Sequence, residues 1–144
     1  MLTLDANVFV SASAPAEAQY AVSLAFIGRV VAQSADVHCP SLVLPEIAAA
    51  IIRPTSNAAL AAQTVSGIRL LPNITLVTLT EQRAEQAAQI AISCRLRGAD
   101  AIYVAVAQEF GTTLITWDAE MLTRGAQAVT VMTPSDWLAA NPTI

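Results

Sequence analysis

The chain has 144 residues, a hydrophobic fraction of 55% and a formal net charge of −4, with seven arginines, no lysine and eleven acidic residues. This length fits one domain with one core, and the apolar fraction excludes wholesale disorder. A sequence pI near 4.7 excludes a protein that coats itself with nucleic-acid phosphates by bulk charge alone. We therefore expect one domain over residues 1–144, and the positions of its few charges become the main question.

Short β-like runs alternate with helical runs in the first half of the chain. The helix that follows Pro15 carries Tyr20, Leu24, Ile27 and Val31 on one face, at spacings of three and four. A proline-containing break is expected at 53–56. The predicted elements are a strand at 2–4, a turn at 6–12, a helix at 16–33, a strand at 37–39 and helices at 42–52 and 57–70.

The same alternation continues in the second half. Thr80 is expected to cap a helix at its start, and Gly98 to end it. The predicted elements are a strand at 74–79, helices at 81–96 and 99–110, a strand at 112–116, a helix at 119–123, a strand at 129–132 and a helix at 134–137. Strands that alternate with helices predict crossover units, hence a three-layer α/β/α fold with a mostly parallel sheet.

Cysteine usage and hydropathy indicate the compartment. Cys39 and Cys94 lie far apart without a CxxC motif, so buried free thiols in a reducing cytoplasm are expected, although one disulfide is formally possible. The start of the chain lacks the basic region of a signal peptide. Every long apolar stretch is interrupted before about 18 residues, so no membrane span is expected.

Four acidic residues interrupt apolar segments, whereas the other seven lie in polar or terminal stretches. These four are Asp5, Glu46, Asp100 and Asp118. In parallel α/β sheets, ligands bind beyond the carboxyl ends of the strands. Asp5 directly follows the first predicted strand and Asp118 lies two residues after the fourth, so both are expected at that edge.

Each of these acids also has a plain structural interpretation. Asp5, Asp100 and Asp118 could cap helices or turns, and Glu46 could lie on a solvent-facing helix surface. Four carboxylates that converge on one cleft would repel each other and raise their own pKa values. A Mg²⁺ or Mn²⁺ ion relieves that repulsion, since both prefer oxygen ligands, and could activate a water for displacement at phosphorus.

The order and spacing of these segments resemble the PIN-domain family, in particular the small VapC-type toxins of toxin–antitoxin pairs, over essentially the whole chain. The stretch around Asp100 is the most specific match, and the stretch that ends at Asp118 includes the hydroxyl of Thr116. The segments that carry the resemblance are 4–10, 45–52, 98–107 and 114–118.

The resemblance implies a sheet ordered 3-2-1-4-5 and metal-dependent cleavage of RNA. Asp5, Glu46, Asp100 and Asp118 would then carry one or two Mg²⁺ or Mn²⁺ ions, with Asp5 and Asp100 as the safest ligands. By the same resemblance, Asn7 and Thr116 would orient the acids or bond the metal-bound water.

The resemblance also implies partners. Members of the family often form homodimers and are commonly silenced by a small antitoxin. The alanines and leucines of the predicted helices at 16–33 and 57–70 suit a dimer or antitoxin surface, and plain core packing would explain them equally well.

Without lysine, substrate phosphates must meet arginine, helix N-termini or metal. Arg95 and Arg97 closely precede Asp100 and are predicted to contact phosphate, with the alternative that they are exposed residues at the end of the preceding helix. Two other functions stay open: a catalytically inactive PIN module that binds a protein partner, and a housekeeping RNA-processing nuclease without an antitoxin.

Overall fold

The structure, a computed structural model, describes residues 1–143 and is built around a five-stranded sheet in which every pairing is parallel. The strands lie in the order β3-β2-β1-β4-β5, which confirms the expected sheet. Their bounds are β1 (Leu2–Leu4), β2 (Val37–Pro40), β3 (Ile74–Val77), β4 (Thr113–Ile115) and β5 (Val131–Met132). The side chains of β1 are buried on both faces, as is typical of a parallel sheet that helices cover on both sides.

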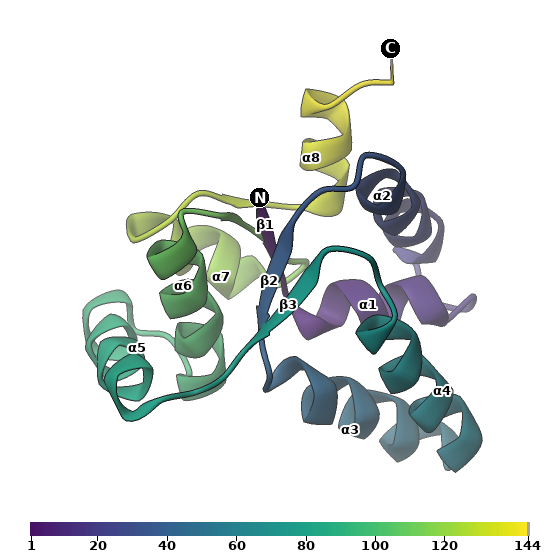
Figure 1. The fold of residues 1–144 in the computed structure, drawn as a ribbon, viewed down its shortest axis with the longest axis horizontal. Coiled ribbons are helices and arrows are strands. Elements are labelled where there is room, and N and C mark those ends of the chain that lie inside the picture. Colours follow the sequence, from purple (N-terminus) through teal and green to yellow (C-terminus); the bar gives the residue numbers. More distant parts are fainter. Residues whose placement is uncertain (144) are drawn as a thin grey trace.

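Helices cover both faces of the sheet and complete the three layers (Figure 1). One face carries α5 (Glu81–Cys94), α6 (Gly98–Phe110) and α7 (Ala119–Arg124), and a short 3₁₀ turn, Gly125–Gln127, follows α7. The other carries α1 (Ala6–Ser13), α2 (Tyr20–Ala32), α3 (Val43–Thr55) and α4 (Ala58–Arg69), while α8 (Pro134–Ala140) packs against α2 and β5. Helix α6 packs on β1, β2 and β4, which explains its nearly continuous apolar sequence.

The first two helices differ from the sequence prediction. The expected turn at 6–12 is the eight-residue helix α1. The expected helix at 16–33 begins only at Tyr20, because Ala14 is extended before Pro15 and the chain then turns twice, with Glu17 N bonded to Ala14 O and Tyr20 N bonded to Glu17 O.

Two helix ends also differ. Pro54 does not break α3 at residue 53, because the helix runs on to Thr55 and ends at Ser56 in a left-handed conformation. Gly98 does not end α5. Arg95 does so at a φ of 55°, and Gly98 begins α6 instead.

One continuous apolar core joins the layers, and both cysteines lie in it as free thiols, as the sequence predicts. Among the helices of the described residues, none is both long and apolar enough to cross a membrane. Ile144, the last residue of the predicted domain, lies outside the described residues.

Candidate active site

Asp5 and Thr116 lie side by side because β1 and β4 are neighbours in register. Leu4 pairs with Ile115, and Asp5 and Thr116 come directly after them. The backbone N–H of Asp5 donates to the carbonyl of Ile115 at 3.0 Å. Both side chains are therefore fixed at the carboxyl edge of the sheet, and both are buried.

A small hydrogen-bond network holds one oxygen of the Asp5 carboxylate. Thr116 Oγ1 donates to Asp5 Oδ2 at 2.8 Å, and Asn7 Nδ2 donates to the same oxygen at 3.1 Å. The Thr116 hydroxyl also accepts from the backbone N–H of Asp118 at 3.0 Å. Asp5 stands at the N-cap of α1 but makes no side-chain capping bond, so its carboxylate is committed to this network instead.

Trp117 anchors the loop that follows β4 to the opposite layer. Its backbone N–H donates to Asn7 Oδ1 at 3.2 Å, and its indole Nε1 donates to Ser23 Oγ at 2.8 Å. The Ser23 hydroxyl lies 2.7 Å from that of Ser11, and both serines are buried. The loop carrying Thr116 and Asp118 is thus tied to α1 and α2.

Asp118 does take the capping role that its sequence position allowed. Its Oδ1 accepts from the backbone N–H of Met121 at 3.0 Å at the start of α7. Its charge nevertheless acts on Asp100, since Asp118 raises the pKa of that carboxyl.

Glu46 comes to the site from α3 and is held by a tyrosine of α6. Tyr103 Oη donates to Glu46 Oε1 at 2.6 Å, and the Tyr103 side chain is 1% exposed. Burial and the bond to Glu46 both raise the pKa of Tyr103 above its usual range, so its hydroxyl stays protonated and remains a donor.

The acids act on one another electrostatically. Burial raises the pKa of Asp5 from its usual 3.8 to about 6, and the charges of Asp100 and Glu46 add to this rise. The hydrogen bond from Thr116 acts in the opposite direction and lowers the pKa. Burial, then the charges of Asp118 and Glu46, raise the pKa of Asp100 to about 6 as well. The structure thus places Asp5, Glu46 and Asp100 within electrostatic reach of one another, and Asp118 within reach of Asp100. We call these four predicted acids the acid cluster.

Glu120, one of the seven acids in polar or terminal stretches, also lies near these carboxylates. Its charge contributes to the raised pKa of Asp100. Arg124 Nη1 lies 3.0 Å from Glu120 Oε1 and also donates to the carbonyl of Arg95 at 2.8 Å. The available signal was its place two residues after Asp118, in the first turn of the same helix.

Arg95 and Arg97 are both exposed, and neither guanidinium makes a hydrogen bond or ion pair within residues 1–143. Arg97 lies near the acid cluster, since its charge lowers the pKa of Asp100. Arg95 closes α5 and contributes its backbone carbonyl to Arg124.

The acid cluster suits a hydrated divalent ion better than a closed metal cage. Across the described residues, no three His, Cys, Asp or Glu side chains are placed so that together they could hold an ion. The donors are nonetheless carboxylate oxygens that repel one another. Mg²⁺ in proteins is often bound by one or two carboxylates and keeps several waters, so the donor set fits such an ion.

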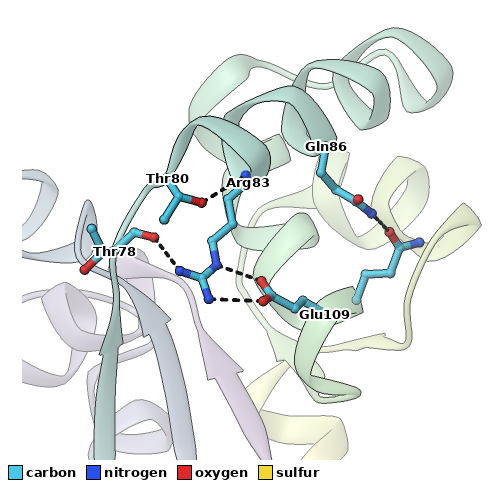
Figure 2. Close-up of polar contacts among 6 residues, drawn as sticks. Thr78, Thr80, Arg83, Gln86 and Glu109 are labelled. Atoms are coloured by element: carbon cyan, nitrogen blue, oxygen red, sulfur yellow. Dashed lines mark hydrogen bonds and ion pairs between the residues drawn. The ribbon is translucent and has the colours of Figure 1, made fainter.

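A separate polar cavity of about 500 Å³ lies between α5 and α6 and is lined by none of the acid cluster. Beside it, Arg83 binds both oxygens of Glu109 at 2.8 and 3.0 Å and donates to the carbonyl of Thr78 at 2.9 Å (Figure 2). These contacts fasten α5 to α6 and to the segment after β3, which indicates a structural role.

An apolar groove of about 320 Å³ lies between α1, α2 and α4. Its apolar lining includes Phe9, Leu24, Ile27, Leu60 and Leu71. Leu24 is 48% exposed, so plain core packing does not account for all the apolar residues of these helices. Helix α1 connects the groove to the acid cluster, because it begins directly after Asp5 and presents Phe9 to the groove.

Fold and site together define a three-layer parallel α/β protein with carboxylates gathered at the carboxyl edge of its sheet. The PIN domain family model matches residues 2–126. The chain belongs to the PIN domain family. No curated protein sequence matches it.

Solved structures share the fold at low sequence identity. The FitAcB structure from Neisseria gonorrhoeae is 19% identical with a TM-score of 0.72, covering 94% of this chain and 99% of that one. The VapC20 sarcin–ricin loop cleaving toxin from Mycobacterium tuberculosis is 18% identical with a TM-score of 0.71, covering 90% and 97%. VapBC2 from Rickettsia felis, bound to a DNA fragment from its promoter, is 12% identical with a TM-score of 0.67, covering 92% and 97%.

Proposed function

We propose that this protein is a metal-dependent endoribonuclease, the toxin of a type II toxin–antitoxin pair. The observation that carries the proposal is the acid cluster, in which burial and mutual repulsion raise the pKa values of Asp5 and Asp100 to about 6. Membership of the PIN domain family supports a nuclease, and one neighbour of the same fold is described as a toxin that cleaves the sarcin–ricin loop.

In this proposal the acid cluster of Asp5, Asp100, Glu46 and Asp118 binds one or two hydrated Mg²⁺ or Mn²⁺ ions, each through one or two of these carboxylates. When bound, the ion supplies Lewis-acid stabilisation of charge at phosphorus and makes its water more acidic. Asn7 and Thr116 fix Asp5 Oδ2, so the carboxylate keeps one orientation. Arg97, beside Asp100, meets a substrate phosphate, while Arg95 contacts the RNA further along the strand.

Cleavage of an RNA pool by purified protein tests the reaction. We expect Mn²⁺ to restore cleavage after chelation, and Asp100→Asn to lower the rate by more than about 100-fold, because it removes a charge that the ion requires. Glu85→Gln on the exposed side of α5 is the matched control and should cleave normally. Equal cleavage by Asp100→Asn and the control would contradict the proposal, and no cleavage together with no Mn²⁺ binding by the unaltered protein would favour an inactive partner-binding module.

We further propose that a small antitoxin binds the apolar groove through an amphipathic helix. One solved neighbour is a toxin–antitoxin complex from Klebsiella pneumoniae. Two others, FitAB and VapBC from Salmonella typhimurium, are bound to DNA. The groove is apolar and partly exposed, as a binding site for such a helix must be. A homodimer and a cytoplasmic location complete the proposal.

Co-expression with the product of the adjacent gene tests the partner. Leu24→Arg places a charge in the groove and should weaken antitoxin binding by about 10-fold or more, since burying an unpaired charge is costly. Leu70→Arg, on a leucine that is 82% exposed, is the control and should bind normally. If no adjacent product co-purifies, the housekeeping RNA-processing nuclease becomes the better interpretation.

A further inference from the structure

Tyr103 links the two helices that bring Glu46 and Asp100 to the acid cluster. It lies three residues after Asp100, on the next turn of α6, so both side chains share one side of that helix. Glu46 belongs to the first turn of α3. Because α6 and α3 cover opposite faces of the sheet (Figure 1), the bond from Tyr103 to Glu46 crosses the carboxyl edge of the sheet.

Glu46 depends on this bond for its position. Within residues 1–143 no other side-chain or backbone group hydrogen-bonds to either of its carboxylate oxygens. Glu46 is also repelled by its neighbours, since its charge acts on both Asp5 and Asp100. A glutamate side chain has three rotatable bonds and loses appreciable entropy when it is ordered. Without a donor, repulsion and entropy would both favour rotamers that turn Glu46 toward solvent.

The Tyr103 hydroxyl is well suited to counter these effects. An O–H donor to an ionised carboxylate forms a short, charge-assisted hydrogen bond, and the 2.6 Å separation between Tyr103 Oη and Glu46 Oε1 falls in that range. The tyrosine ring is itself fixed, because its side chain is 1% exposed and packed in the core. A rigid buried donor can therefore hold a flexible acceptor in one place.

We propose that Tyr103 is a positioning residue that holds Glu46 Oε1, so that Glu46 presents Oε2 alone to the divalent ion of the proposed function, on which this inference rests. Carboxylates bind cations through one oxygen or through both, and occupying one oxygen favours the single-oxygen mode. Asp5 follows the same pattern, since Thr116 and Asn7 both bond to its Oδ2. Asp118 Oδ1 is likewise bound by the backbone N–H of Met121, so three of the four acids each have one oxygen held by protein donors.

A titration of the purified, metal-free chain with Mn²⁺, monitored by calorimetry in the absence of RNA, tests the inference. Tyr103→Phe removes only the hydroxyl and should weaken Mn²⁺ binding by about 10-fold, the usual effect of losing a partner of a metal ligand. Tyr20→Phe, at the only other tyrosine, is the matched control and should bind Mn²⁺ as the unaltered chain does.

A double-variant cycle separates positioning from a general structural role. If Tyr103 acts through Glu46, Tyr103→Phe should change Mn²⁺ affinity less than about 2-fold in a Glu46→Ala background, since coupled residues are not additive. An equal loss in both backgrounds, or no loss in either, would overturn the inference while leaving the proposed function intact. Failure of the unaltered chain to bind Mn²⁺ would overturn both. Thermal unfolding of each variant shows whether it is folded, and Glu46→Gln, which keeps an acceptor for Tyr103, replaces Glu46→Ala if the latter unfolds.

Discussion

Asp5→Asn is expected to remove RNA cleavage and, in the absence of metal, to make the protein more stable at neutral pH. The amide that replaces the carboxylate carries no charge to attract the ion, so the rate should fall by more than about 100-fold. The Asp5 carboxylate is 7% exposed and its pKa rises from 3.8 to about 6. A shift of that size means that the charged form disfavours folding by about 3 kcal/mol, which the neutral amide avoids.

The amide also preserves the local contacts, because its carbonyl oxygen can still accept from Thr116 and Asn7. We expect a gain of about 1–3 kcal/mol in the free energy of unfolding, seen as a rise of about 3–10 °C in Tm. Asp36→Asn, at an exposed aspartate before β2, is the control and should change neither property. A variant that lost stability as well as activity would show that Asp5 serves the fold rather than an ion.

The second large effect is the pH dependence of the metal-free protein, whose stability should fall as the pH rises from 3.8 to about 6. As pH increases, the unfolded chain releases the Asp5 proton first, because its pKa there is lower than in the folded state. The folded state therefore binds more protons over this interval, and the free energy of unfolding decreases. Asp100 acts in the same direction, with a smaller effect because it is only half-buried.

Thermal unfolding across this interval, with chelator and then with Mn²⁺, measures the effect. We expect the metal-free chain to lose about 2 kcal/mol from Asp5 between the two ends. Mn²⁺ should oppose that loss at neutral pH, since a ligand that binds only the folded state stabilises it. The Asp5→Asn variant should show a much flatter profile. A stability that rose steadily over the same range in the unaltered metal-free chain would contradict the raised pKa.

The sheet could be predicted because its pattern repeats. Apolar runs such as Leu2–Leu4 and Thr113–Ile115 alternate with helical segments, and that alternation leaves few topologies. Asp5 could be placed because it follows the first strand with no intervening residue. The strand order itself came from the resemblance to the PIN-domain family, since periodicity alone does not determine which strands are neighbours.

Helix ends were harder to predict because they depend on tertiary contacts. Gly98 looked like a helix terminator, yet Arg95 adopts the left-handed conformation, and its carbonyl is bound by Arg124 from α7. Pro54 looked like a break, yet it removes only its own N–H bond to the carbonyl four residues earlier, and α3 continues through Thr55.

The contribution of Tyr103 could not be read from the chain, and that of Glu120 only in part, because each depends on a residue distant in sequence. Tyr103 stands in an apolar run and is buried in the core, but its hydroxyl donates to Glu46, 57 positions earlier. Glu120 lies in a polar stretch, and only the fold brings its charge close enough to act on Asp100.

The hydrogen bond from Trp117 to Ser23 makes Trp117 an intrinsic fluorescence probe of this region. Trp117 lies between Thr116 and Asp118 in sequence, and its indole is fastened to α2, a helix that also lines the apolar groove. A partner that shifts α2 in the groove therefore also disturbs the surroundings of the indole. Trp137, the other tryptophan, packs edge-on against Phe26 of the same helix at 5.1 Å. Both indoles therefore contact α2, and intrinsic tryptophan emission can report groove occupancy without any label.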